Sequence, residues 1–426
     1  MSQTVHPLLQ EKSPSLNQEK LIEILINQEN ILIIQDLDGV CMGLVKDPLD
    51  RTIDPNYVKA AKALDGHFYV LTNGEHIGKR GVNPIIDRAF DDAKFVQNNG
   101  LYLPGLGAGG VQWQDRFGNV SHPGVTQQEL TFLAKVPQRI RQELEQFLNQ
   151  SSIPYLPTTI DTLIEASILD NMASPTANLN TLYEQLKDYP ELYASLQKRM
   201  QQLMESLLSL AHEEGLTDSF FIHYAPNLGR DENGKEILKP VEASDSGTTD
   251  FQFMIRGAIK EAGVLDILNR YYQQRTGEYP LGKSFNVRNA PNDYANLLAL
   301  VHQNFDPNLM PIMVGVGDTV NSSVIERNGS LEARRGGSDR AFLQLIQDIH
   351  PHNLVVYIDS SGGEVQNRKP VRLETTAGGE QKIIDGPTDP RDTEDPLTFN
   401  VIFPGGHTEY TAFFQNLAAH RRHSNI

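Results

Sequence analysis

Apolar and polar residues alternate in blocks over the first hundred positions of the chain. Apolar runs lie at 31–34, 67–71 and 94–98, and helix-like spacing of apolar residues lies between and before them, at 18–28, 54–64 and 84–90. Asp54 and Pro55 supply an N-cap and a first-turn proline for the second of these helices. Strands that alternate with helices predict a doubly wound parallel sheet.

The alternation stops near residue 110 and returns near residue 311. The glycine-rich stretch 105–110 matches a dinucleotide-binding pattern, but the residues after it predict a strand and a turn at Gly118-Asn119 instead of the helix which that motif needs. Residues 126–214 are mostly helical in pattern, with an interruption near Pro190. A hairpin is expected within 221–235, with its turn at Asn233-Gly234.

Three further strands are expected in the last third of the chain. Apolar runs at 311–317, 354–358 and 397–403 predict them, and a helix is expected at 408–420. The polar segment 360–396 reads as a long loop with a hairpin near Gly378-Gly379. The sequence therefore predicts an α/β fold with a core in two pieces, 19–110 and 281–426, around an inserted α+β cap domain, 111–280, after a mobile segment, 1–18.

Length, charge and cysteine content narrow the function classes. A chain of 426 residues is too long for one compact core. With 37 basic and 54 acidic residues, its net charge of −17 argues against nucleic-acid and anionic-membrane partners. The single cysteine, Cys41, excludes a disulfide within the chain, fits a cytoplasmic protein and reads as a small buried residue. No apolar run reaches the length that spans a membrane.

Polar residues follow three of the predicted strands, and this is where chemistry is expected. These residues are Asp36-Leu37-Asp38-Gly39, Thr72-Asn73-Gly74 and Gly317-Asp318-Thr319. Ligands of doubly wound sheets bind beyond the carboxyl ends of the strands. Each motif alone is also common in turns, but three in order favour a functional site.

Asp36 and Asp38 can face one reacting centre, since residues two apart on an extended chain point the same way. Clustered carboxylates suit Mg²⁺ together with phosphate oxygens. One aspartate can attack phosphorus as a nucleophile, and the second can act as general acid and base. A hydroxyl such as that of Thr72 can hold a phosphate oxygen, and a lysine can balance the charge of the transition state.

The motifs DLDGV, LTNG and GVGDTVNSS resemble those of the haloacid dehalogenase-like phosphatase superfamily. The resemblance implies that Asp36 is the nucleophile, that Asp38 is the acid and base, and that Thr72 binds the phosphoryl group. It also implies Mg²⁺ held by Asp36, the backbone carbonyl of Asp38 and Asp318, and a cap between the second and third motifs.

Two departures from the superfamily pattern concern the metal and the lysine. Asn321-Ser322-Ser323 stands where a second acid is common, so that Asn321 would reach the metal through water. Residues 281–301 resemble the strand and helix that carry the lysine, but Pro291-Asn292-Asp293 opens that helix. We prefer Lys283 as the catalytic cation, with Arg288 as the alternative.

Within the superfamily the chain resembles glucosylglycerol-phosphate phosphatases, enzymes of compatible-solute synthesis in salt-stressed cyanobacteria, from about residue 20 to the C-terminus. This implies a sugar-phosphate substrate and suggests association with the glucosylglycerol-phosphate synthase. From the residues alone, a phosphatase for sucrose or trehalose phosphate, or a weakly active sugar-phosphate-binding regulator, stays open. The residues expected to bind substrate are Asn73, Gly74, Glu75, His76, Arg80, His223, Arg230 and Arg288.

Overall fold

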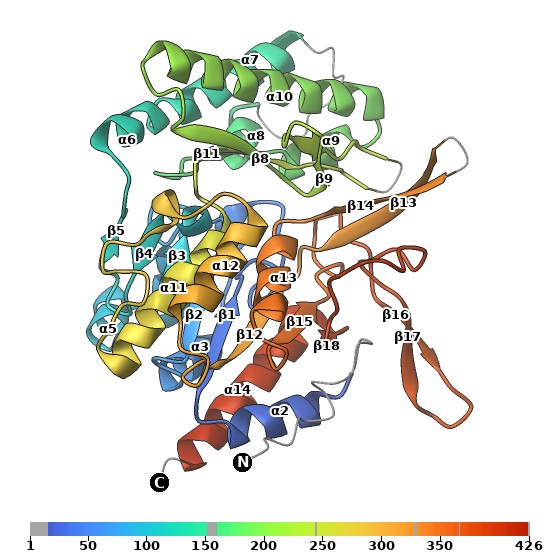
Figure 1. Ribbon diagram of the computed structural model, residues 1–426. Coiled ribbons are helices and arrows are strands. Elements are labelled where there is room, and N and C mark those ends of the chain that lie inside the picture. Colours follow the sequence, from blue (N-terminus) through green and yellow to red (C-terminus); the bar gives the residue numbers. More distant parts are fainter. Residues whose placement is uncertain (1–15, 151–159, 243–244, 328–329, 366, 425–426) are drawn as a thin grey trace.

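The computed structural model describes residues 16–150, 160–242, 245–327, 330–365 and 367–424 and has two layers of structure, one above the other (Figure 1). Most of the segment predicted to be mobile, 1–18, lies outside the described residues, and helix α2 (Gln18–Asn27) begins at its end. Within the described part of the chain, no helix is both long and apolar enough to cross a membrane.

The lower layer is built on an eight-stranded sheet, and the predicted α/β fold class is confirmed. Its first six strands in spatial order are parallel, and the last two continue the sheet in antiparallel fashion. In that order the strands are β18 (Val401–Phe403), β15 (Leu354–Ile358), β12 (Ile312–Gly317), β1 (Ile31–Gln35), β2 (Phe68–Leu71), β3 (Gly105–Gly107), β4 (Gln112–Gln114) and β5 (Val120–Ser121).

Helices cover both faces of this sheet, because its strands are apolar on both sides. Alternate residues of β1 enter different cores: Leu32 and Ile34 pack on one face, Ile31 and Ile33 on the other. The first face carries α11 (Lys260–Thr276), α12 (Tyr294–Asn304) and α13 (Arg340–Ile349). The second carries α2, α3 (Pro55–Ala63), α4 (Val82–Phe90) and α14 (Gly406–Ser424).

The predicted strand at 94–98 is wrong, because these residues form helix α5 (Ala93–Asn98). The side chain of Asp92 caps this helix by accepting a hydrogen bond from Phe95 N at 2.9 Å, and of its residues only Val96 is buried. The third parallel strand is β3, inside the glycine-rich stretch. A Cβ on Gly105 would lie 2.2 Å from the carbonyl oxygen of Val70, so this close approach of two strands requires glycine.

The upper layer is a four-stranded antiparallel sheet with helices on the side away from the core (Figure 1). Its strands in spatial order are β6 (Ile168–Leu169), β7 (Thr176–Asn178), β11 (Asp250–Ile255) and β8 (Phe220–Ala225). The helices are α6 (Gln127–Leu133), α7 (Val136–Gln150), α8 (Ile160–Ser167), α9 (Asn180–Leu186) and α10 (Pro190–Glu213). The predicted interruption near Pro190 separates α9 from α10.

The ends predicted for the inserted domain, 111 and 280, are wrong. Strands β4 and β5 continue the main sheet up to Ser121, and α11 packs against β2, β3 and α13 from residue 260 onward. The insertion therefore comprises residues 126–259, and we call it the cap.

Three β-hairpins extend from the two layers. One pairs β9 (Asn227–Arg230) with β10 (Glu236–Leu238) in the cap, where a hairpin was predicted. The second pairs β16 (Arg372–Thr375) with β17 (Gln381–Asp385) around Gly378-Gly379, which was also predicted. The third, β13 (Asn321–Arg327) with β14 (Ser330–Gly336), was not expected and separates β12 from α13.

Candidate active site

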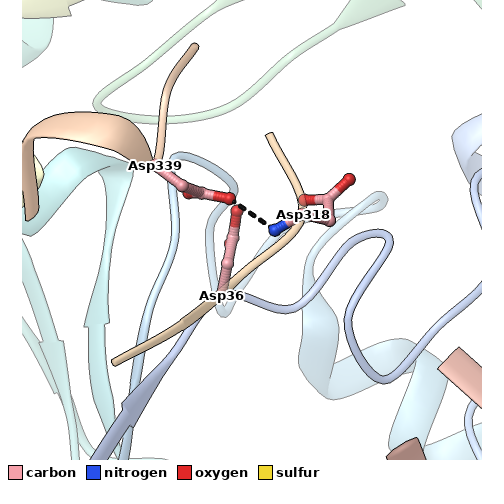
Figure 2. Close-up of side chains that lie close together, drawn as sticks. All are labelled: Asp36, Asp318 and Asp339. Carbon is pink, nitrogen blue, oxygen red and sulfur yellow. Dashed lines mark hydrogen bonds between the residues drawn. The ribbon is translucent and has the colours of Figure 1, made fainter. Parts of the chain in front are cut away.

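Three buried aspartates meet at the carboxyl edge of the main sheet (Figure 2). Asp36 follows β1, Asp318 follows β12, and Asp339 directly precedes α13. One carboxylate oxygen of each residue lies within 4.8 Å of the others. Figure 2 shows the backbone N–H of Asp318 donating a hydrogen bond to the carboxylate of Asp339, at 2.9 Å. Two of the three were predicted to meet here, and Asp339 was not.

A buried lysine joins two of these carboxylates. Lys260, the first residue of α11, places its Nζ 2.6 Å from Oδ2 of Asp36 and 2.6 Å from Oδ1 of Asp339. Its side chain is 2% exposed. The sequence predicted a charge-balancing lysine within 281–301, whereas the buried lysine that contacts Asp36 lies outside that segment.

Burial and mutual repulsion set the electrostatics of the cluster. Burial raises the pKa of Asp36 to about 8, although Lys260 acts in the opposite direction. Burial likewise raises the pKa of Asp318 to about 6, against the effect of the Arg368 guanidinium. The pKa of Asp339 stays below its usual range because the contact with Lys260 and two backbone N–H donors outweigh its burial.

The donor set fits a hard divalent cation. When all three carboxylates of the cluster are ionised, they outnumber the two cations beside them, Lys260 and Arg368, so negative charge is left over. The buried Oδ2 of Asp318 has no hydrogen-bond partner among the described residues, and the Nε of Arg368 lies 3.5 Å from it. An unpartnered carboxylate oxygen in an oxygen-rich cluster is the arrangement that suits Mg²⁺.

Asp38 lies at the mouth of the same site and is held by an arginine. Arg51 Nη1 lies 2.9 Å and 3.2 Å from the two carboxylate oxygens of Asp38. Gly39 follows with a φ of +79°, and a Cβ there would lie 2.2 Å from Asp318 Oδ2. Glycine therefore allows the chain to turn beside the cluster and approach it closely.

The site opens into a cavity of about 140 Å³ between the core and the cap. The core contributes three groups of residues to its wall: the two aspartates after β1, the motif after β2, and three arginines. The cap contributes polar residues of β7 and β11. From the core these are Asp36, Asp38, Thr72, Asn73, Gly74, Glu75, Arg51, Arg80 and Arg368, and from the cap Thr176, Asn178, Asp250 and Gln252.

Two of the residues predicted to bind substrate connect the core to the cap. The carboxylate of Glu75 accepts hydrogen bonds from the backbone N–H groups of Met172, Ala173 and Ser174, at 3.0, 2.6 and 3.0 Å. Arg80 Nη1 lies 3.1 Å from Asp170. Both residues line the cavity, and these contacts hold the cap in place above it.

Asn73 and His223 form a further contact between the two layers. Asn73 Nδ2 lies 3.2 Å from Nε2 of His223, whose Nδ1 lies 2.8 Å from Glu236. Both residues line a second, adjoining cavity of about 380 Å³, which Lys260 and Arg230 also line. The predicted cap residues His223 and Arg230 thus share a cavity with Lys260.

Four predicted site residues line neither of the two cavities. Lys283 is exposed and lines neither cavity. Arg288 pairs with Glu129 at 2.9 Å. Asn321 donates to the carbonyl of Asn227, which is 3.2 Å away. His76 is fully buried between Gly105 and Gln114, and burial lowers its pKa to about 4, so it is a core residue.

Asp339 and Lys260 were not predicted from the sequence, because neither belongs to a recognisable short motif. Asp339 lies after the hairpin β13–β14, whose strands pair Asn321 with Gly336 and so return the chain to the end of β12. Ser338-Asp339 before the amphipathic segment 340–349 is a recognisable helix start. Lys260 likewise opens a helix, but it lies before the segment 281–301, in which the lysine was expected.

The chain is similar to known proteins over nearly its whole length. The model of the glucosylglycerol-phosphate phosphatase family matches residues 30–418. The chain is 58% identical over 419 residues to a protein of Synechocystis sp. named glucosylglycerol-phosphate phosphatase, covering 97% of this chain and 99% of that relative.

Solved structures show more distant likeness. A trehalose-6-phosphate phosphatase of Aspergillus fumigatus is 10% identical, with 96% of this chain and 99% of that chain covered and a TM-score of 0.37. The C-terminal domain of the C. albicans trehalose-6-phosphate phosphatase is 9% identical, with the same coverage and a TM-score of 0.44.

Proposed function

Because the chain belongs to the glucosylglycerol-phosphate phosphatase family, we propose that it hydrolyses glucosylglycerol 3-phosphate to glucosylglycerol and phosphate. The observation that carries the chemistry is the contact of buried Lys260 with Asp36, beside Asp318 and Asp339. The observation that carries the substrate is the similarity over nearly the whole chain, cap included. The reaction would complete the synthesis of a compatible solute under salt stress.

In the proposed first step, Asp36 attacks phosphorus in line and the bond to the sugar alcohol oxygen breaks. Asp38 donates a proton to that oxygen, so the alcohol leaves neutral and an aspartyl-phosphate forms on Asp36. In the second step, Asp38 takes a proton from water, whose oxygen attacks phosphorus and restores the carboxylate of Asp36. Arg51 orients Asp38, because its Nη1 contacts both carboxylate oxygens.

Other core residues stabilise the transferring group in this proposal. Lys260 places a fixed positive charge on the nucleophile, where the charge of the transition state gathers. The hydroxyl of Thr72, which lines the cavity, binds a phosphoryl oxygen. Asp339 orients Lys260 and, through two backbone N–H groups, the turn that carries Asp318.

We further propose that Mg²⁺ binds to Asp36, Asp318 and the backbone carbonyl of Asp38. The unpartnered Oδ2 of Asp318 supports this assignment. When bound, Mg²⁺ neutralises the phosphoryl oxygens that would otherwise be repelled by three carboxylates. Asn321, predicted as a ligand through water, is not part of this proposal because its amide contacts Asn227.

The cap is proposed to select the substrate and to exclude water while the aspartyl-phosphate forms. The contacts of Glu75 with 172–174 and of Asn73 with His223 support a closed arrangement. We also propose that the protein acts in the cytoplasm and associates with the glucosylglycerol-phosphate synthase. Co-purification of the two proteins from cells would test that association.

The experiment that tests the function measures phosphate release from a panel of sugar phosphates. Glucosylglycerol phosphate, sucrose phosphate and trehalose phosphate are supplied with Mg²⁺ or with EDTA, and Asp36→Asn is the control. We expect fast release from the first substrate only, lost with EDTA and in the variant. Preference for another sugar phosphate would retain the mechanism and refute the substrate.

A sugar-phosphate-binding regulator is the alternative from another class. Its one support in the sequence was the missing second acid after Asp318. In the structure, Asp339 supplies a second carboxylate close to Asp318, which weakens that support. Release of phosphate from none of the substrates by folded, Mg²⁺-loaded protein would still favour the regulator.

A further inference from the structure

The side of the cap sheet that faces the core is polar. Gln252 on β11 pairs with Thr176 on β7 and with His223 on β8, and Asp250 on β11 pairs with Asn178 on β7. Paired residues of neighbouring strands, and residues two apart along one strand, share a face. These five residues therefore form one surface, which we call the polar strand face.

The opposite side of the same sheet is a hydrophobic core. Phe251 and Phe253, which alternate with the polar residues of β11, are fully buried there with Phe132 and Phe220. Helix α10 packs on this side, away from the main sheet (Figure 1). The polarity of the other side is therefore not needed to pack the cap, and a buried polar surface without such a role calls for a ligand.

One atom of the polar strand face lacks a hydrogen-bond partner. The Oε1 of Gln252 is buried and has no hydrogen-bond partner among the described residues, and Gln252 as a whole is 9% exposed. Its neighbours are partly satisfied within the cap: Asn178 Nδ2 donates to Asp250 at 2.7 Å, and Thr176 Oγ1 donates to the carbonyl of Ser174 at 2.8 Å. Leaving a buried amide oxygen unpaired is costly, so a donor from a ligand is expected.

The cavity places this face opposite the chemistry. Its wall includes Gln252, Asp250, Asn178 and Thr176 from the cap, and Asp36 and Asp38 from the core. A ligand with its phosphoryl group at Asp36 would extend its other end toward the cap. Apolar side chains also line this cavity, among them Leu44, Val45 and Val365, and can cover the C–H surface of a sugar ring.

We propose that the polar strand face binds the hydroxyl groups of the glucosyl half of the substrate, with Gln252 as a specificity-determining residue. This inference rests on the proposed function and deepens it. Sugar hydroxyls both donate and accept hydrogen bonds, which matches an unpartnered amide beside a carboxylate and a second amide. The residues predicted from the sequence for this role included His223 but neither Gln252 nor Asp250.

The test compares two substrates that differ only in the sugar. Gln252→Leu keeps the approximate volume of the side chain and removes its hydrogen bonds. We expect kcat/KM for glucosylglycerol phosphate to fall about 10- to 100-fold, mainly through KM, as for one lost buried hydrogen bond to a ligand. Turnover of glycerol 3-phosphate, which lacks the glucosyl group, is expected to stay unchanged.

A second readout uses binding without turnover. Glucosylglycerol, the product, should inhibit hydrolysis of p-nitrophenyl phosphate competitively in the wild type and more weakly in Gln252→Leu. The matched control is Gln201→Leu, since Gln201 lies on the cap but lines a groove that does not include the polar strand face. If the leucine variant does not fold, Gln252→Met provides the same loss in an unbranched side chain.

Each outcome separates this inference from the proposed function. Equal losses for both substrates would show a structural role for Gln252 and overturn the inference. Full retention of the preference for glucosylglycerol phosphate in Gln252→Leu would overturn it too, while the proposed function stands. A wild type that turns over glycerol 3-phosphate and does not prefer glucosylglycerol phosphate would refute the proposed substrate, and with it the subsite.

Discussion

Replacing Lys260 by methionine tests the assignment on which the proposed mechanism most depends. The substitution keeps a long side chain and removes the charge that lies 2.6 Å from both Asp36 and Asp339. At an effective dielectric constant near 20, each of these contacts corresponds to about 6 kcal/mol of Coulomb attraction. Desolvation of the three buried groups offsets much of that attraction.

The net effect follows from what the substitution leaves behind. Asp36 and Asp339 remain buried without a cation, and breaking such a buried pair costs about 3–5 kcal/mol of stability. The transition state also loses a preorganised positive charge, which is worth about 100- to 1000-fold in kcat. We therefore expect Lys260→Met to be less stable by that amount and nearly inactive.

The assay combines phosphate release at saturating Mg²⁺ with urea unfolding, so that loss of activity is measured on folded protein. Lys283→Met is the matched control, because Lys283 is exposed and was the lysine favoured by sequence alone. We expect its activity and stability to equal those of the wild type. Normal activity of Lys260→Met, or loss of activity in Lys283→Met alone, would refute the structural assignment.

Three further predictions concern the residues around the cluster. Gly39→Ala adds a Cβ 2.2 Å from Asp318 Oδ2 at a φ of +79°. We expect thermal unfolding to show a loss of about 1–3 kcal/mol of stability. We expect metal titration to show a higher Mg²⁺ concentration for half-maximal activity. Glu75→Gln weakens the acceptor of the N–H groups of 172–174; faster hydrogen exchange there and a higher KM are expected. Burial lowers the pKa of His76 to about 4, so the unfolded chain binds the proton first and the wild type should become less stable as the pH falls from 6.5 to 4. At about 1.4 kcal/mol per pH unit, the loss of stability amounts to about 3 kcal/mol. In urea unfolding, His76→Gln should make this pH dependence flatter.

For each of these three predictions, one result would contradict the reasoning. An unchanged Mg²⁺ requirement in Gly39→Ala would show that residue 39 does not affect the proposed metal site. Unchanged exchange at 172–174 would mean that Glu75 does not hold the cap. A pH dependence in His76→Gln as steep as that of the wild type would assign the acid sensitivity to other groups.

The local sequence pattern was sufficient to predict the location of residues that directly follow a strand. Asp36, Asp38, Thr72 and Asp318 follow apolar runs directly, and parallel strands place their carboxyl ends on one edge, so their meeting could be predicted. Local pattern failed at 94–98, where Asp92 caps a helix in a segment that reads as a strand. It also failed at Gly105, whose strand is visible only through its close approach to Val70.

The sequence by itself determined the α/β class and the position of two aspartates at the end of the first strand, and it predicted an inserted module. Only the tertiary structure decided that Lys260 contacts Asp36, that Asp339 is the third acid of the cluster and that Gln252 lines the cavity. These residues come to the site from a helix start, from the far side of an inserted hairpin and from a cap strand. Their spacing in the sequence depends on the length of the insertions between them, whereas their chemistry depends on distance in space.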